Sequence, residues 1–280
     1  MIPFLGAGAS VGSRNPSSDS WPGVGAEFLP ASGELAGYLA EEAEYPEPDP
    51  QDLAKVAQYA WISSGRTGLH AALRPVFNRD YQPLPVHEYL ASIEVPLLIV
   101  TTNYDTLVED ALTSAGRPHD IVVQTTDEDL ADQVYWIPHD SSVPELKTLG
   151  GPGGLDIDLS ARTVVYKIHG SVNRTAGEND QYLITEDDYV SFLGRMTGGK
   201  AIPMVFAEAF QTRQFLFLGH GLGDWNLRVL LNRLQTRPSV DDPSWAIQKD
   251  VTDVEKEFWS KRGVNVYEVD VTDFVGGLND

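Results

Sequence analysis

Three segments of this sequence place a polar side chain or a glycine turn directly after a short apolar run. Asn103 and Asp105 stand two positions apart behind one run, His169 ends a second, and Gly6-Ala-Gly-Ala-Ser10 follows a third. Open α/β sheets bind their ligands just beyond the carboxyl ends of the strands. These residues therefore stand where such a sheet would carry out its chemistry, and the three segments together predict a nucleotide site.

The glycine turn has a spacing that lets the backbone approach a pyrophosphate, because Gly6 and Gly8 flank a single alanine. The third glycine of the dinucleotide fingerprint is absent from its usual place, although Gly12 lies nearby. No acidic residue ends a second strand about 20 positions further on, where the fingerprint has one. Taken alone, this segment is equally consistent with a tight strand-to-helix turn that binds nothing.

The polar residues also have structural interpretations. An Asn or Asp at the start of a helix is a good N-cap, so one of Asn103 and Asp105 is expected to be structural in part. His169 on its own fits a core histidine, yet the end of a strand is where a general base is mounted. For His220, which follows another apolar run, ligand contact and loop packing fit the sequence about equally well.

The elements that position these residues alternate between apolar, β-branched runs and stretches of helical periodicity. This alternation predicts an α/β fold with a Rossmann-like parallel sheet, helices on both faces and an inserted helical layer. Ser32 is the predicted cap of the first helix, and Thr185 with Asp188 fits a capping box. The predicted strands cover residues 2–5, 97–101, 120–124, 163–168, 214–218, 244–248 and 265–270. The predicted helices cover residues 34–44, 52–63, 69–77, 87–93, 105–115, 185–193, 203–211, 227–235 and 255–262.

The pattern along the chain predicts a single domain over residues 1–280. It carries a helical insertion at 33–93 and a loop-rich insertion at 125–160, in which the glycine-rich residues 150–154 look most flexible. Residues 13–32 are rich in Ser, Pro and Gly. We expect them to form a loop of the kind that covers ligands, in effect a lid.

The composition argues against several functions. The formal charge of −21 disfavours broad nucleic-acid binding, which needs clustered Lys and Arg. It also means that an anionic nucleotide needs local compensation from backbone N–H groups and a helix N-terminus. No apolar run approaches the roughly 20 residues that span a bilayer, and the N-terminus does not resemble a signal peptide. The absence of cysteine excludes disulfides and Cys-based zinc sites, and we expect a cytoplasmic protein without membrane contact.

The segments Gly6-Ala-Gly-Ala-Ser10, Thr102-Asn-Tyr-Asp105 and Lys167-Ile-His-Gly170 together resemble the sirtuin superfamily of NAD-consuming enzymes. The similarity is closer to the sirtuin-like NAD hydrolases of bacterial anti-phage systems. Residues 183–189, 215–221 with Asp224, and the closing strand at 264–269 also resemble that branch. The resemblance extends over nearly the whole chain, in the same order, and is therefore more specific than any one motif.

This resemblance implies roles for individual residues. Asn103 would hold the nicotinamide ribose and orient the attacking water, and Asp105 would bond the nicotinamide carboxamide. His169 would contact a ribose hydroxyl and act as the base. The Arg that follows the glycine turn in sirtuins has its nearest candidate in Arg14. The residues implied at the pyrophosphate and along the adenosine side are Gly6, Ala7, Gly8, Ser10, Gly219, Gly221 and Asp224.

One departure from the family pattern bears on the reaction. Protein deacylases of the superfamily carry a four-cysteine zinc module, and this chain has no cysteine. Water is therefore favoured as the acceptor, which predicts hydrolysis of NAD, as substrate, to nicotinamide and ADP-ribose. Nicotinamide is a cationic, good leaving group, so the site has only to hold ribose and pyrophosphate and place one water. The chemistry requires no metal.

Two other functions remain open. The chain fits a catalytically silent module that senses NAD or ADP-ribose and controls a partner, although such a sensor need not keep both Asn103 and His169. A nicotinamide-dependent oxidoreductase is the weaker alternative, because the sequence lacks the ribose-binding acid. For the hydrolase, we expect a regulated effector of anti-phage defence that acts by abortive infection through NAD depletion. Control would come from a homo-oligomer, or from a separate regulatory protein or domain.

Overall fold

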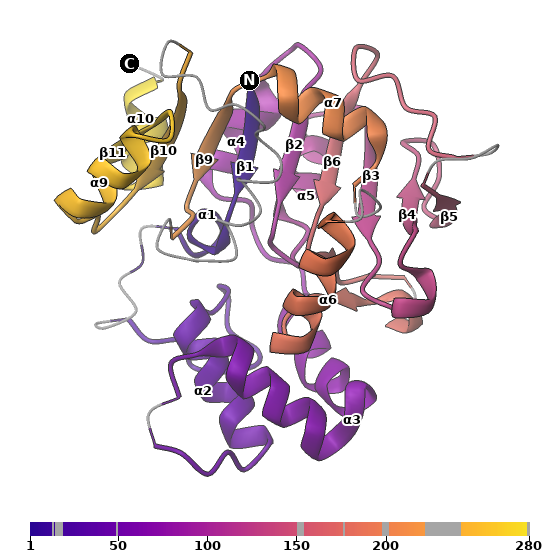
Figure 1. Ribbon diagram of the computed structural model, residues 1–280, viewed down its shortest axis with the longest axis vertical. Helices are drawn as coiled ribbons and strands as arrows, with labels where there is room; N and C mark the ends of the chain where they lie inside the picture. The colour runs from indigo at the N-terminus through magenta and orange to yellow at the C-terminus, as the bar shows by residue number, and fades with distance from the viewer. Residues whose placement is uncertain are drawn as a thin grey trace.

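The computed structural model describes residues 1–12, 14, 19–48, 50–149, 154–175, 177–197, 202–221 and 242–278. Its centre is a nine-stranded sheet in which the first strand of the sequence lies next to the middle strand (Figure 1). The strands run in the order β11 (Val264–Glu268), β10 (Ser244–Gln248), β9 (Phe215–Leu218), β1 (Ile2–Leu5), β2 (Leu98–Thr101), β6 (Thr163–Lys167), β3 (His119–Gln124), β4 (Gln133–Ile137) and β5 (Glu145–Thr148).

The strands from β11 to β3 are parallel, and only β4 and β5 at one edge are antiparallel. The register brings the ends of the central strands level, because Leu5 pairs with both Thr101 and Leu218, and Thr101 pairs with Lys167. The four loops that leave β9, β1, β2 and β6 consequently start in one row. This confirms the prediction that the three chemistry-bearing segments share one edge of a parallel sheet.

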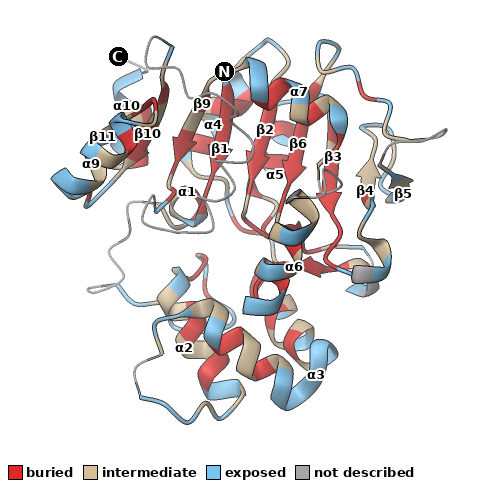
Figure 2. Cartoon of the chain, in the orientation of Figure 1, coloured by how far each residue is buried: buried red, intermediate tan, exposed pale blue. Residues whose placement is uncertain are grey.

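Helices cover both faces of the sheet, and the central strands are buried throughout (Figure 2). Alternate strand residues pack to opposite sides. Phe4 and Val100 pack with α7 (Met204–Thr212) and α9 (Asp253–Ser260), whereas Leu5 and Ile99 face the other layer. That second layer consists of α4 (Pro85–Ser92), α5 (Leu107–Ser114) and α10 (Val271–Leu278). The fold is therefore Rossmann-like, as predicted.

A separate helical layer lies beyond the carboxyl ends of the strands (Figure 1). It consists of α2 (Ser32–Glu42) and α3 (Leu53–Phe77), which bury their apolar residues against each other. Gly65 interrupts α3 with a φ of 72° and a ψ of 171°, so the two helices predicted at 52–63 and 69–77 correspond to its two halves.

The layer is tied to α6 (Glu186–Thr197) through side chains near the start of that helix. Arg66 forms a 2.9 Å ion pair with Asp188, and Gln58 donates to Asp187 at 2.8 Å. The predicted capping box is confirmed: the Asp188 amide donates to the Thr185 hydroxyl at 3.1 Å, and the Thr185 amide donates to the Asp188 carboxylate at 3.0 Å.

Several sequence predictions need correction. Residues 125–160 are not only loop, because they contribute β4 and β5. The residues of β4 are mostly half-buried, so the strand lacks the uninterrupted apolar run that identified the central strands. Ser32 does not cap α2; the helix starts there, and the Glu34 carboxylate instead accepts from the Ala31 amide at 2.7 Å. The helix α10 was not predicted, and the predicted helix at 227–235 lies outside the described residues.

The remaining short elements surround the row of strand ends. The glycine turn leads into α1 (Ala7–Val11), and β7 (Gly170–Ser171) pairs antiparallel with β8 (Gln181–Tyr182). Two 3-10 turns cover Glu128–Leu130 and Gly177–Asn179. None of the described helices combines the length and the apolar character needed to cross a bilayer.

Candidate functional site

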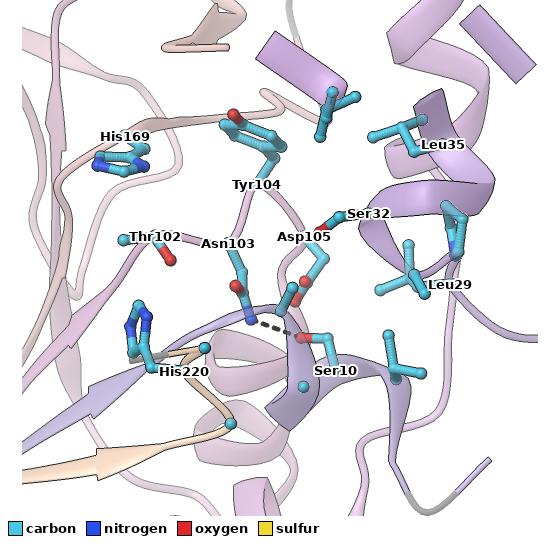
Figure 3. Close-up of a pocket in the computed structure, with 18 of the residues that line it drawn as sticks. Ser10, Leu29, Ser32, Leu35, Thr102, Asn103, Tyr104, Asp105, His169 and His220 are labelled. Atoms are coloured by element: carbon cyan, nitrogen blue, oxygen red, sulfur yellow. Dashed lines mark hydrogen bonds between the residues drawn. The ribbon is translucent and has the colours of Figure 1, made fainter. Parts of the chain in front are cut away.

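A cavity of about 460 Å³ opens at the carboxyl ends of the central strands, between the sheet and the helical layer (Figure 3). The loops after β1, β2, β6 and β9 form one side of it. Apolar residues that include Leu29, Leu35 and Leu53 form the other. Its volume lies within the range of roughly 300–1,000 Å³ that is usual for small-molecule sites.

Most of the sequence-predicted residues meet in this cavity. Those that line it are Ala7, Gly8, Ser10, Asn103, Asp105, His169, Gly219 and Gly221. Gly6 does not line the cavity, although its carbonyl group contacts Asn103. Asp224 lies outside the described residues. The geometry brings together segments that are far apart in the sequence, while the role of each residue toward a ligand stays a prediction.

The glycines at the turn permit a close approach of two backbone segments. The amides of Gly6 and Gly8 donate to the carbonyls of Leu218 and Gly219 at 3.0 and 2.9 Å. A Cβ atom on Gly8 would lie 2.9 Å from the Gly219 carbonyl oxygen. Gly219 has a φ of 68°, and a Cβ there would lie 2.2 Å from the Ala9 nitrogen. The turn after β1 is thus locked to the turn after β9, and two of its amides are already used within the protein.

Asn103 connects the β2 loop to the glycine turn and is only 9% exposed. Its side-chain amide donates to the Gly6 carbonyl at 2.9 Å and to the Ser10 hydroxyl at 2.8 Å. Its own backbone amide donates to the Thr101 hydroxyl at 3.0 Å. Because both hydrogens of the side-chain amide are engaged, the group that Asn103 has left for a ligand is its carbonyl oxygen, which is a hydrogen-bond acceptor.

Asp105 has the partly structural role that was expected for one of the two polar residues. Its Oδ1 accepts from the Leu107 amide at 3.1 Å, at the first residue of α5. Its backbone carbonyl accepts a hydrogen bond from the buried Lys167. Asp105 also lines the cavity beside Ser32, across from the β9 loop (Figure 3). It is the single charged residue among the described residues that line the cavity.

His169 follows β6 and packs edge-on against Tyr189 and Phe192, with ring centroids 5.6 and 6.0 Å away. Burial, together with a smaller effect of the neighbouring His220, lowers the pKa of His169 to about 3. The imidazole is therefore neutral at pH 7. A neutral imidazole can accept a proton from a water or a hydroxyl group, which is the state that a general base needs.

His220 lines the same cavity and was not among the predicted site residues. It is 8% exposed, and its ring packs edge-on against Phe4 with the centroids 4.9 Å apart. Burial lowers its pKa to about 4, so it too is neutral. The available signal was its place directly after the apolar residues of β9, which is the same place that His169 has after β6.

The cavity offers a ligand few fixed charges. Neither Lys nor Arg occurs among the described residues that line it, and the whole chain carries a formal charge of −21. A ligand held here would depend on neutral acceptors, hydroxyl groups and backbone groups. Within the described ranges, no cluster of three or more His, Asp or Glu residues could hold a metal ion.

Comparison with known proteins matches residues 97–267 to the family described as SIR2-like domain. Defense-associated sirtuin 2 of Bacillus subtilis is 22% identical over 271 residues, which are 95% of this chain and 23% of that protein. The NAD(+) hydrolase ThsA of Cytobacillus dafuensis is 25% identical over 223 residues, 78% of this chain and 38% of that protein.

A second protein of that name, the NAD(+) hydrolase ThsA of Acinetobacter baumannii (strain 532279), is 29% identical over 187 residues. The match covers 66% of this chain and 31% of the relative. The chain thus spans well under half the length of each of these three relatives. The family match covers more than half of this chain, including β2, β6 and β9 with the residues that follow them. The chain belongs to the family of SIR2-like domains.

Proposed function

We propose that this chain hydrolyses NAD to nicotinamide and ADP-ribose. The observation that carries the proposal is that Asn103 and a neutral His169 line one cavity together with the glycine turn. Two of the relatives, at 25% and 29% identity, are named NAD(+) hydrolases. These names support the same reaction for the domain that they share with this chain.

In the proposed reaction, the bond between the nicotinamide nitrogen and C1′ of its ribose breaks. Nicotinamide leaves as a neutral molecule with the bonding electron pair, and the ribose gains oxocarbenium character. A water molecule adds its oxygen to C1′ and gives a proton to His169, which completes ADP-ribose. A positioned general base of this kind contributes about 10²–10⁴-fold.

The acceptor oxygen of Asn103 suits the proposed role of holding a ribose hydroxyl and orienting the water. Since Ser10 and Gly6 fix the amide, the oxygen is positioned before the substrate arrives, which is the condition for electrostatic and orientational catalysis. One carboxylate oxygen of Asp105 accepts from the Leu107 amide at the start of α5. The other would accept a hydrogen bond from the carboxamide of nicotinamide.

The remaining assignments follow the course of the dinucleotide through the cavity. Ala7, Gly8 and Ser10 would border the pyrophosphate, with Gly6 supporting Asn103 from behind. Gly219 and Gly221 would line the adenosine side, and Asp224 is assigned to the same side from the sequence alone. NAD is the substrate in this scheme, and the reaction has no metal-dependent step.

The biological role that we propose is a regulated effector of anti-phage defence that depletes NAD. One relative is named a defence-associated sirtuin. An enzyme that consumes a universal cofactor harms its host unless it is controlled, so we also propose regulation by self-association or by a separate regulatory protein or domain.

The reaction is tested with purified protein over a wide range of concentrations, with nicotinamide and ADP-ribose quantified by chromatography. We expect equal amounts of both products, lost in Asn103→Ala and in His169→Ala. Asn265→Ala on β11 and His119→Ala on β3 are the matched controls outside the cavity, and both should retain activity.

The alternatives give different results in the same experiment. Saturable binding of ADP-ribose without turnover at any concentration would favour the silent sensor. Absorbance at 340 nm that changes with added alcohol or carbonyl substrates would favour an oxidoreductase. Full activity in either cavity variant would overturn the proposed roles of Asn103 and His169.

A further inference from the structure

One of the residues that line the cavity has a polar atom without a partner. Nε2 of His220 is buried and has no hydrogen-bond partner among the described residues. A buried polar atom that is left unpaired costs about 1–3 kcal/mol, so such atoms call for an explanation. In a residue that lines a cavity, the direct explanation is a ligand that supplies the missing partner.

The surroundings of the other ring nitrogen, Nδ1, indicate whether the partner of Nε2 is a hydrogen-bond donor or an acceptor. The backbone of Leu5 acts to raise the pKa of the His220 ring, which is the effect of a carbonyl oxygen that faces a ring N–H. Because Nε2 is unpaired, the ring nitrogen that faces Leu5 is Nδ1, which also lies close to the glycine turn: a Cβ on Gly6 would come within 2.8 Å of it. A carbonyl oxygen accepts only from an N–H, so Nδ1 carries the proton. In the neutral ring Nε2 is then a hydrogen-bond acceptor.

The position of the ring limits which part of a dinucleotide it can reach. His220 abuts the glycine turn through Gly6 and stands on the same side of the cavity as Thr102 and His169 (Figure 3). Under the proposed function, the glycine turn borders the pyrophosphate. The groups bonded directly to a pyrophosphate in NAD are its two riboses, whereas both bases lie one ribose further away.

Because Nε2 is an acceptor, its partner must be a group that can donate a hydrogen bond. The phosphate oxygens are hydrogen-bond acceptors and cannot pair with Nε2, which is also an acceptor. A ribose hydroxyl, by contrast, has a proton that it can donate to Nε2. We infer that Nε2 of His220 accepts a hydrogen bond from a hydroxyl group of one of the two riboses that are bonded to the pyrophosphate. This assigns His220 as a substrate-binding residue of the proposed NAD site, and the inference rests on the proposed function for the identity of the ligand.

Two isosteric substitutions separate this role from loop packing. Asn places its polar atoms near the position of Nδ1, so His220→Asn keeps a donor for Leu5 and removes the acceptor. Gln reaches the position of Nε2, so His220→Gln restores an acceptor there. ADP-ribose contains both riboses and the pyrophosphate and is the product of the proposed reaction. Its affinity can therefore be measured by calorimetry without turnover.

We expect His220→Asn to weaken ADP-ribose binding about tenfold, from the loss of one hydrogen bond. His220→Gln should recover most of that loss, and His119→Asn, outside the cavity, should bind as the wild type does. Equal affinity of wild type and His220→Asn overturns the inference. If both variants lose affinity equally together with thermal stability, His220 is a packing residue and the inference also fails.

ADP-ribose analogues that each lack one ribose hydroxyl identify the partner. Removal of the contacted hydroxyl should weaken binding to the wild type about tenfold and leave binding to His220→Asn unchanged. If every analogue loses the same affinity for both proteins, no hydroxyl contacts His220. Binding of ADP-ribose with no turnover of NAD would count against hydrolysis by this chain alone and would leave this inference standing. Turnover of NAD by the wild type and by a fully active His220→Asn variant would support the proposed hydrolysis and overturn the inference about His220.

Discussion

Lys167 donates a hydrogen bond to the backbone carbonyl of Asp105 and forms a 3.0 Å ion pair with Glu109. Both charged residues are buried, Lys167 at 1% and Glu109 at 7% exposure. Lys167 stands two positions before His169 on the chain. The pair therefore joins β6, which His169 follows, to the segment that carries Asn103 and α5, and it fixes the two proposed catalytic residues relative to each other.

The Lys167→Met variant should be strongly destabilised, because it leaves the buried Glu109 carboxylate without its partner. The expected cost is about 3–5 kcal/mol in the free energy of unfolding. The double variant Lys167→Met with Glu109→Leu should recover a large part of that loss, since it leaves no unpaired charge. Urea unfolding gives the free energy of unfolding of the wild type, the single variant and the double variant. A double variant no more stable than the single one would show that the pair does not act in this way.

The same double variant tests the positioning role. It should fold, yet turn NAD over more slowly than the wild type, because the Asp105 carbonyl has lost its donor. The exposed pair of Glu257 on α9 and Lys261 directly after it is the control, and Lys261→Met should change the free energy of unfolding by less than about 1 kcal/mol. Wild-type turnover in the folded double variant would argue against positioning by Lys167.

Gly219→Ala should disrupt the contact between the turns after β9 and β1. The added Cβ would meet backbone atoms of Ala9 and Gly8 at 2.2 and 2.6 Å, and the φ of 68° disfavours any side chain. We expect a loss of at least about 2 kcal/mol in stability and a loss of ADP-ribose binding. Gly194→Ala on α6, where a Cβ meets nothing within 4 Å, is the matched control. Equal thermal midpoints for the two variants would contradict the prediction.

Stability should fall as the pH drops below neutrality. Burial lowers the pKa of His169 to about 3 and those of His220 and His87 to about 4, whereas an unfolded chain titrates its histidines near 6.5. Below that pH the unfolded state binds more protons than the folded state. The stability is therefore complete above about pH 6.5 and is lost toward pH 4, at up to about 1.4 kcal/mol per pH unit for each histidine.

The contribution of one histidine can be isolated in His87→Asn. His87 lies outside the cavity, and its Nδ1 accepts from the Leu84 amide at 3.0 Å, an acceptor that Asn can replace. Urea unfolding between pH 5 and 7.5 should give a smaller slope than in the wild type, because one of the four histidines whose pKa is lowered by burial, which include His70, is gone. An unchanged slope would mean that His87 is not a source of the pH dependence.

Arg14 should hold residues 19–31 in place beside the cavity. It pairs with Glu34 at 2.5 Å, donates to the carbonyls of Asp19 and Leu29, and lies over the ring of Phe28. This pairing and two backbone amides outweigh the effect of burial and lower the pKa of Glu34 to about 2. Arg14 thus has a structural partner, and it does not line the cavity.

In Arg14→Met, the backbone amides of Trp21 and Ala31, which donate to Glu34, should exchange faster with deuterium. The Michaelis constant for NAD should rise, because Leu29 lines the cavity and would lose its fixed position. Lys55→Met, which removes an exposed pair with Glu47, is the control and should change neither quantity. Unaltered exchange at both amides would show that Arg14 does not hold this segment.

The sequence was sufficient for those parts of the fold that local patterns determine. The central strands are buried on both faces and read as continuous apolar runs, and their ends mark where Asn103 and His169 stand. The capping box of Thr185 and Asp188 is local and was predicted. The edge strand β4 was missed because its half-buried residues give no such run.

Other features of the site depend on contacts between distant residues. Lys167 and Glu109 are 58 positions apart, and nothing in the sequence around either residue indicates that the two form an ion pair. The unpaired nitrogen of His220 becomes visible only when the surroundings of the ring are known. In the same way, the hydrogen bonds from Gly6 and Gly8 to the β9 side require the sheet order, which periodicity does not determine.

The position of β1 has a consequence for the synthesis of the protein. Among the strands of this sheet β1 is made first, yet it lies between β2 and β9, and the glycine turn is completed by carbonyls of Leu218 and Gly219, more than 200 positions later. Until those residues have emerged, one wall of the cavity is missing and the nascent chain cannot assemble the pocket. Contacts between such distant residues also fold slowly. The proposed activity would thus stay absent from the nascent domain until β9 has been made and has paired with β1.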